Sequence, residues 1–299
     1  MAETYRCPLC SNILEELFYD AKDYEYASST DEYFGVAYCE DCCIGFSLPF
    51  MDASQLESHY SEVYNAYLPK KGVIQWLQSF KYHQDIRKIQ KYSSDASKTL
   101  FDIGAGGGHF IAHAAKYGYE IDGCELSPYG VKAAKELYNL NLLQASAEDV
   151  QFKQRYDIIT MKHVLEHCVD FVPCLQKIFD YGLSNKGTLF LQLPQMKSYT
   201  SEKFGKYWYD YSLPYHRTHF TSTGIIKILT DIGFETVIYL REDIPLIYDR
   251  SMMQKPSESG FEKIYKLLPK LIRLILAQII LFVNKDKSSD RMIIMAQKP

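Results

Sequence analysis

The chain has 299 residues, a formal net charge of −4, and apolar and charged fractions of 47% and 23%. These values are typical of a globular protein with one large domain, or one domain with an appendage. The excess of acidic residues argues against broad binding to a nucleic-acid backbone, which requires a basic face.

The N-terminus lacks the basic and apolar regions of a secretory signal, so we expect the chain in the reducing cytoplasm. Two Cys-x-x-Cys motifs follow, CPLC and CEDC. Four such thiolates satisfy the tetrahedral preference of Zn²⁺, which favours a structural zinc site over free or redox-active thiols. The expected ligands are Cys7, Cys10, Cys39 and Cys42, with Cys43 outside the site unless it replaces Cys42.

Residues 1–67 are therefore expected to form a small zinc ribbon with short strands, which the metal would stabilise. Only Arg6 and Lys22 are basic in this stretch, so it is a poor candidate for reading nucleic acid. We expect it to serve as structure or as part of a substrate wall.

A helix is expected at 70–92, and beyond it strands alternate with helices. Strand patterns occur at 99–103, 119–125, 156–161, 187–194, 235–240 and 291–297. This alternation predicts an α/β fold, with a mostly parallel, Rossmann-like sheet of seven strands and helices on both faces. Ligands of such sheets bind beyond the carboxyl ends of the strands, at the point where the strand order reverses.

The first of these strands runs into the glycine-rich turn GAGGG, residues 104–108. A dinucleotide fingerprint would need a third glycine where His109 stands, and a phosphate-binding Walker loop would need a lysine that is missing. Glu125 ends the next strand, where a carboxylate can accept both ribose hydroxyls of an adenosine.

Five segments in this order and spacing resemble class I S-adenosylmethionine-dependent methyltransferases: LFDIGAGGGHFI, GCELSPYGVKAA, QASAEDVQF, YDIITMKHVLEHCVD and LFLQLP. The resemblance covers residues 98–241 and a returning strand at 291–297. It implies a methyltransferase domain of residues 68–242 and 291–299 that binds S-adenosylmethionine.

The same resemblance implies roles for individual residues. The loop would approach the methionine portion, Glu125 would bind the ribose, and Lys162 and His163 would line the methionine end. The implied cofactor-binding set is Asp102, Gly104, Ala105, Gly106, Glu125, Leu126, Ala147, Glu148 and Lys162. Ser146 stands where many relatives have Asp before the residues that flank the adenine, which leaves the adenine amine to Glu148 or Asp149.

An aromatic-rich segment, residues 194–220, follows the fifth strand and is expected to cover the strand ends. It resembles the lid of a methyltransferase subfamily that also carries an N-terminal cysteine ribbon and includes enzymes acting on deoxysugars and on polysaccharide or lipid-linked precursors. Methyl transfer needs a group that removes the acceptor proton, and histidine suits that role at neutral pH. The candidates are His163, His167, His216 and His219, with Glu166 available to orient one of them.

Residues 243–290 interrupt the return to the last strand and contain an apolar run, 271–283, that is too short to span a bilayer. We expect this helical insertion to pack on the domain or to form a homodimer. The alternative is that residues 261–285 lie on the inner membrane face, with lysines on the wet side.

The expected function is methyl transfer from S-adenosylmethionine to a small or carrier-linked acceptor, with a sugar of surface-polysaccharide biosynthesis as the first candidate. The alternatives are a quinone- or lipid-precursor methyltransferase, an RNA methyltransferase and a non-catalytic ribbon scaffold. The expected partners are a small-molecule or lipid-linked sugar rather than nucleic acid.

Overall fold

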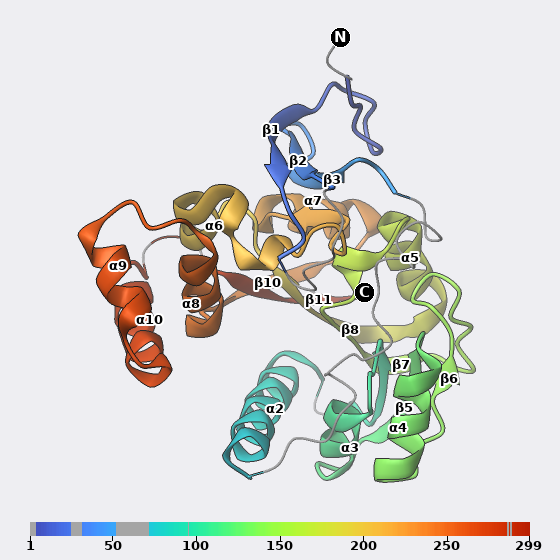
Figure 1. Cartoon of the computed structure of the whole chain (residues 1–299). Helices are drawn as coiled ribbons and strands as arrows, with labels where there is room; N and C mark the ends of the chain where they lie inside the picture. Colours follow the sequence, from blue (N-terminus) through green and yellow to red (C-terminus); the bar gives the residue numbers. More distant parts are fainter. Residues whose placement is uncertain (1–3, 25–31, 52–71, 95, 286, 288) are drawn as a thin grey trace. The chain divides into compact units, whose positions relative to one another are not determined.

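The computed structural model of the chain describes residues 4–24, 32–51, 72–94, 96–285, 287 and 289–299 (Figure 1). The chain divides into two compact units. Residues 1–60, 193–225 and 240–293 form the ribbon unit, and residues 61–192, 226–239 and 294–299 form the sheet unit. The expected boundary at residues 67–68 lies outside the described residues.

A seven-stranded sheet organises the sheet unit. The strands, in the order of the sheet, are β10 (Thr236–Glu242), β11 (Arg291–Gln297), β8 (Leu183–Pro194), β7 (Tyr156–Lys162), β4 (Thr99–Ile103), β5 (Glu120–Glu125) and β6 (Leu143–Gln144). The strand pairs β4–β5, β4–β7, β5–β6 and β7–β8 are all parallel. The expected α/β, Rossmann-like sheet is confirmed.

The central strands are continuous apolar runs because they are buried on both faces. Leu100 and Ile103 of β4 and Ile158 and Ile159 of β7 are fully buried. The chain passes from β4 to β5 and β6 on one side and returns to β7 on the other, so the strand order reverses between β4 and β7. This reversal fixes where a ligand site is expected.

Helices precede and connect the strands of this sheet. They are α2 (Gly72–Tyr92), α3 (His109–Ala115), α4 (Pro128–Tyr138), α5 (Phe171–Lys177) and α7 (Ser222–Ile232). Pro128 opens α4 after the extended residue Ser127, because proline fits the first helical turn without a lost hydrogen bond. A 3₁₀ turn, Leu165–His167, follows β7.

The ribbon unit contains a second, antiparallel sheet of order β1-β2-β3-β9. Its strands are β1 (Glu15–Ala21), β2 (Phe34–Cys39), β3 (Ile44–Leu48) and β9 (Thr218–Phe220). His219 lies in β9, opposite Gly45 of β3. The helix begins only at Ser222, because the pairing with β3 keeps the preceding residues extended.

The rest of the ribbon unit is helical. It consists of α6 (Tyr199–Phe204), the 3₁₀ turns Gly205–Tyr207 and Tyr209–Tyr211, α8 (Pro245–Gln254), α9 (Gly260–Leu267) and α10 (Lys270–Val283). These elements share one buried cluster with β1 and β2, and its aromatic members include Phe34, Trp208, Tyr211, Tyr248 and Tyr265. The predicted ribbon, the aromatic segment and the helical insertion are therefore parts of one packed unit.

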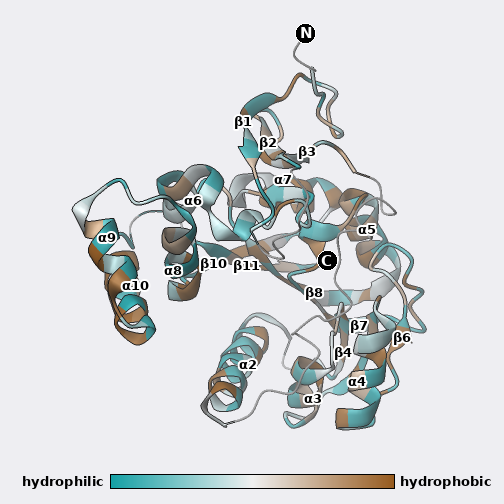
Figure 2. Ribbon diagram, in the orientation of Figure 1, coloured by the Kyte–Doolittle hydropathy of each residue, from teal (hydrophilic) through white to brown (hydrophobic). Residues whose placement is uncertain are grey.

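Helix α10 is the most apolar of the C-terminal helices, and Figure 2 shows brown residues along it. Ala277 and Leu281 are buried in the cluster of the ribbon unit. No helix among the described residues combines the length and apolar character needed to cross a membrane.

Candidate active site

The glycine loop after β4 is bound to the neighbouring strand through its backbone. The amides of Gly104 and Ala105 both donate to the carbonyl oxygen of Cys124, at 2.9 Å each. Gly104 and Gly106 have φ angles of +72° and +56°, a region that glycine occupies without steric cost. A Cβ on Gly104 would collide with Val164, whereas a Cβ on Gly106 would meet no described atom within 4 Å. The loop therefore offers open space at Gly106 for the close approach of a ligand.

Glu125 ends β5 with a carboxylate that two backbone amides orient. The amide of Gly106 donates to Oε2 at 2.8 Å, and the amide of Ser127 donates to Oε1 at 2.9 Å. Each carboxylate oxygen has further lone pairs that can accept hydroxyl groups. The structure thus brings the loop and the acidic residue together, as the sequence predicts.

Asp102 lies at the end of β4, just before the loop, and is 3% exposed. Burial raises the pKa of Asp102 to about 7, although the Thr160 hydroxyl and the charge of Lys162 both oppose the rise. The Thr160 hydroxyl donates to Oδ1 at 2.5 Å. Asp102 therefore supports the loop from a buried position, and its carboxyl group ionises near neutral pH.

Lys162, the last residue of β7, makes a buried ion pair that the sequence analysis missed. Its Nζ lies 2.6 Å from Oδ2 of Asp85 in α2, and 4.2 Å from the centroid of the Phe110 ring. Burial opposes ionisation of Asp85, but Lys162 and Lys88 outweigh it and hold the pKa of Asp85 below its usual value. The sequence does contain a sign of this pair, because Asp85 is a charged residue next to Ile86 on the apolar face of the helix.

His163 and Glu166 follow β7 and form a pair. His163 has a φ of +56°, and its amide donates to the carbonyl oxygen of Gln192 at 2.9 Å. Its Nδ1 lies 3.3 Å from Oε1 of Glu166, a carboxylate whose side chain is 1% exposed. A positive φ at a residue other than glycine costs free energy and is common at functional sites. The structure thus places Glu166 beside His163, and a role for this pair in methyl transfer stays a prediction.

His167 ends the same 3₁₀ turn, where its amide donates to the carbonyl oxygen of Val164 at 3.0 Å. The other two candidate bases, His216 and His219, belong to the ribbon unit. Burial lowers the pKa of each to about 3, so both rings stay neutral near pH 7. Nδ1 of His216 lies 2.8 Å from the carbonyl oxygen of Asp210, and Nε2 of His219 lies 2.9 Å from the Ser47 hydroxyl. A role for these three histidines in methyl transfer stays a prediction.

The residues expected near the adenine lie after β6. Oε1 of Glu148 accepts the amide of Asp170 at 2.7 Å, at the start of α5. Asp149 accepts the Ser146 hydroxyl at 2.7 Å, while the carbonyl of Ala147 accepts the Cys174 thiol at 3.4 Å. Leu126, beyond Glu125, is 65% exposed. Contacts of Leu126, Ala147, Glu148 and Asp149 with an adenine stay predictions.

The two Cys-x-x-Cys motifs form a compact cluster in the ribbon unit. The sulfur atoms of Cys7, Cys10, Cys39 and Cys42 all lie within 4.8 Å of one another. The Cys7–Cys42 distance is 3.8 Å and the Cys10–Cys39 distance is 3.5 Å. Four sulfurs bound at about 2.3 Å in a tetrahedron lie roughly 3.8 Å apart, so the cluster has the dimensions of a zinc site.

Cys43 lies outside the cluster, and its thiol donates to the carbonyl of Glu40 at 3.3 Å. Its φ of +55° turns the chain from the second motif into β3.

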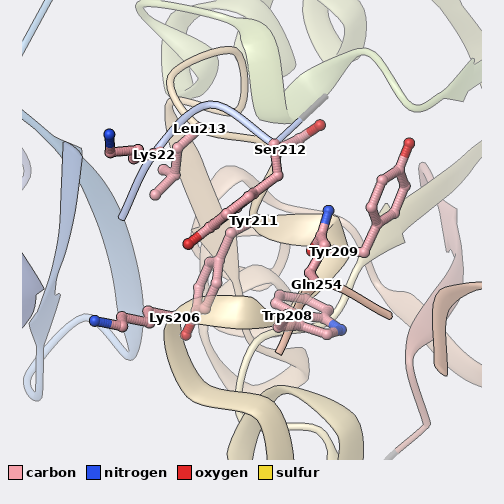
Figure 3. Close-up of a pocket in the computed structure, with 9 residues that line it drawn as sticks. Lys22, Lys206, Trp208, Tyr209, Tyr211, Ser212, Leu213 and Gln254 are labelled. Atoms are coloured by element: carbon pink, nitrogen blue, oxygen red, sulfur yellow. The ribbon is translucent and has the colours of Figure 1, made fainter. Parts of the chain in front are cut away.

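The aromatic segment also forms hollows that the sequence did not mark. Figure 3 shows one in which Trp208, Tyr209 and Tyr211 lie beside Lys206 and Gln254. An adjoining hollow of about 420 Å³ is lined by Tyr24, Tyr209, Leu246, Asp249, Arg250, Met253, Gln254, Lys270 and Arg273. Its volume is within the range of small-molecule sites.

Known proteins share both the sequence pattern and the fold. Residues 77–239, more than half of the chain, match the methyltransferase domain family. The chain is 28% identical over 102 residues to a ubiquinone biosynthesis O-methyltransferase of Rickettsia prowazekii, and 29% identical over 92 residues to one of Hydrogenovibrio crunogenus. These matches cover 32% and 28% of the chain and 40% and 38% of the relatives. The chain thus spans about two fifths of the length of these relatives.

Two solved structures have a similar fold. A SAM-dependent methyltransferase from Archaeoglobus fulgidus has a TM-score of 0.51 at 17% identity, over 74% of this chain and 94% of that one. Phosphoethanolamine N-methyltransferase 2 of Haemonchus contortus, in complex with S-adenosylmethionine, has a TM-score of 0.51 at 18% identity, over 73% of this chain and 52% of that one. The sheet order, the glycine loop and the family match lead to one conclusion: the chain belongs to the methyltransferase domain family.

Proposed function

We propose that the protein transfers the methyl group of S-adenosylmethionine to a small or carrier-linked acceptor. The observation that carries this proposal is the contact of Glu125 with Gly106, since it sets a ribose-accepting carboxylate beside an open, positive-φ glycine. Gly104 and Gly106 would hold the amino-acid tail, and Glu125 the ribose. When bound, S-adenosylmethionine supplies an electrophilic methyl group on its sulfonium sulfur.

The protein's own contribution is to orient the acceptor and to take its proton. The His163–Glu166 pair supports a base at this position. When Nδ1 donates to Glu166, Nε2 is the ring atom that can accept the proton of an acceptor hydroxyl. The buried carboxylate then stabilises the imidazolium that forms, as in other acid–histidine pairs.

A sugar, free or attached to a carrier, is our first candidate for the acceptor. The resemblance of the ribbon and the aromatic segment to sugar-modifying methyltransferases supports it. The 420 Å³ hollow also supports it, because aromatic side chains such as Tyr209 pack against sugar rings while Arg250 and Lys270 attract the phosphates of a carrier.

A phenolic quinone precursor is the second candidate, and the curated relatives are the observation that favours it. Methyl transfer from labelled donor to a panel of nucleotide sugars, lipid-linked glycans and prenylated catechols separates the two. Incorporation into the catechols alone would exclude the sugar.

Binding of S-adenosylhomocysteine, measured by calorimetry, tests the cofactor itself. Glu125→Gln removes the negative charge that accepts the ribose hydroxyls. Hydrogen bonds to charged groups contribute about 1.5–3 kcal/mol, so we expect roughly a tenfold to hundredfold loss of affinity. Glu120→Gln, at the exposed start of the same strand, is the matched control. Failure of the wild type to bind, or an unchanged affinity in Glu125→Gln, would contradict the proposal.

We also propose that the four-cysteine cluster binds a structural Zn²⁺. Burial raises the pKa of Cys7 to about 11, so without a cation this thiol keeps its proton at neutral pH. A divalent metal would hold the thiolates and join the N-terminal turn at Cys7 and Cys10 to the turn between β2 and β3.

A further inference from the structure

We infer that the outer face of α9 and α10 binds the surface of a bilayer that contains anionic lipids. This inference concerns where the protein works, and it does not rest on the proposed methyl transfer. The evidence is an apolar face without cover among the described residues, a local excess of positive charge, and a buried hub that fixes the two helices to α8.

Nine large apolar side chains of the two helices are 44% to 85% exposed. We call them the docking face: Phe261, Ile264 and Leu267 of α9, and Leu271, Ile272, Ile275, Ile279, Phe282 and Val283 of α10. Residues 271, 275, 279 and 282 recur every three or four positions and so share one side of the helix. A surface helix normally places charged residues there.

The opposite side of α10 already has its partners. Ala277 and Leu281 are buried in the cluster of the ribbon unit together with Tyr248 and Met252 of α8. Helix α10 is therefore apolar on both sides, but only one side contacts its own unit. Apolar patches of this kind mark a binding surface for a protein or a membrane.

The charge of the residues around the docking face favours a membrane over a second copy of the chain. Residues 260–287 contain six Lys or Arg and two Asp or Glu, and Asp249 of α8 neutralises one of the six, Arg273, which leaves a net charge of +3, whereas the whole chain has 33 basic and 37 acidic residues. Lys263, Lys266 and Lys270 lie on or beside the two helices, and Lys285 follows α10. A symmetric dimer through this face would set two such clusters against each other. Anionic lipids would instead neutralise them.

A buried carboxylate holds the helices in this arrangement. Asp249 of α8 lies 2.7 Å from Nε of Arg273, and it accepts the Tyr265 hydroxyl at 3.1 Å. The same hydroxyl lies 3.0 Å from the carbonyl oxygen of Arg273. Asp249 is 2% exposed, so α9 and α10 are fixed from their inner side and keep the docking face outward.

Flotation of the full chain with vesicles tests the inference. The probes are phosphatidylcholine vesicles and vesicles that also contain phosphatidylglycerol. Ile275→Ser/Ile279→Ser makes the middle of the docking face polar without touching the core. The matched control is Ile74→Ser/Leu77→Ser on α2, whose side chains are 63% and 53% exposed, against 53% for each of the two isoleucines. Thermal unfolding verifies that each variant is folded.

We expect the wild type and the α2 control to float with the phosphatidylglycerol vesicles, and the docking-face variant to bind at least tenfold more weakly. Lys263→Gln/Lys270→Gln should lose roughly fivefold in affinity per lysine for the anionic vesicles, and added salt should have a similar effect. Phe282→Trp gives a second readout, because insertion shifts its fluorescence to the blue and lets brominated lipids quench it.

Three results would overturn the inference. The first is a wild type that floats with neither kind of vesicle. The second is a docking-face variant that binds like the wild type. The third is a dimer in sedimentation equilibrium that Ile275→Ser/Ile279→Ser dissociates while vesicle binding is absent, since the occupant would then be a second copy of the chain.

Discussion

Replacing Asp85 by asparagine removes the counter-charge of Lys162, whose ammonium group is largely buried in the folded protein. The Asp85 side chain is 0% exposed and that of Lys162 is 14% exposed, and their charged atoms are 2.6 Å apart. Asparagine keeps the shape of the side chain and one acceptor oxygen, but it leaves the ammonium group without a counter-charge. The ion pair joins α2 to the end of β7, beside the predicted cofactor loop.

Loss of one member of a buried ion pair typically costs 3–5 kcal/mol. We take the lower end, about 3 kcal/mol, because Lys162 keeps some exposure and contacts the Phe110 ring. With an unfolding entropy of about 2.1 cal/mol/K per residue over a chain of 299 residues, that corresponds to a decrease in melting temperature of roughly 5 °C. The pKa of Asp85 is below its usual value, so the stabilisation is complete above pH 3.8 and disappears as the pH falls through the folded-state pKa.

Urea unfolding at pH 7, followed by circular dichroism, measures this cost. Lys88→Gln is the control, because Lys88 is 29% exposed and its loss should cost less than about 1 kcal/mol. The double variant Asp85→Asn/Lys162→Met removes both charges and should be less destabilised than the sum of the single variants, by about 2 kcal/mol. Costs that simply add would show that the two residues do not act as a pair, and would refute the reasoning.

Two further predictions concern buried groups outside this pair. The pKa of Asp102 is raised to about 7 in the folded protein. As pH rises above 3.8, the carboxyl group ionises in the unfolded chain before it ionises in the folded protein, so the free energy of unfolding falls. Asp102→Asn lacks this group and should gain up to about 4 kcal/mol over the wild type by about pH 8. Urea titrations from acid to alkaline pH measure that difference, and a constant difference would exclude the mechanism. Chelation should lower the melting temperature and release one zinc ion per chain, and metal analysis should find zinc in Cys43→Ser but little in Cys42→Ser. Equal zinc contents in the two variants would argue against the assigned ligands.

The parts of the fold that the sequence predicted are those with strong local signals. The strand at 99–103 is a short apolar run that stops at glycines, and Glu125 lies at the end of the next strand. The four-cysteine cluster was predictable because the spacing within each motif limits how its thiols can be placed. In each case residues close in sequence determine the geometry.

The features that the sequence did not predict depend on distant partners or on very short segments. Strand β9 has three residues, and its partner β3 lies more than 170 positions earlier, so no local pattern marks it. Strand β6 has only two residues. In the sequence, a carboxylate beside apolar helix residues suggests the exposed edge of the apolar face. That Asp85 is buried becomes evident only when its partner Lys162, 77 positions later, is known.

Within the ribbon unit, the turn at Cys42 and Cys43 packs against the chain that follows the aromatic segment. The Thr221 hydroxyl donates to the carbonyl oxygen of Cys43 at 2.7 Å. A Cβ on Gly224 of α7 would lie 2.5 Å from that same oxygen and 2.9 Å from the carbonyl oxygen of Cys42. The start of α7 therefore packs directly on the backbone of the second cysteine motif.

This contact assigns the ribbon a structural purpose. The turn that contributes Cys42 to the proposed zinc site also positions β9, since Ile44, the first residue of β3, pairs with Phe220. His216 and His219 lie on the chain between the aromatic turns and this anchor, and the Ser47 hydroxyl of β3 contacts both the carbonyl oxygen of His216 and the ring Nε2 of His219. The four-cysteine cluster of the ribbon, once it holds the proposed Zn²⁺, would give a rigid support to the segment that carries the two histidines.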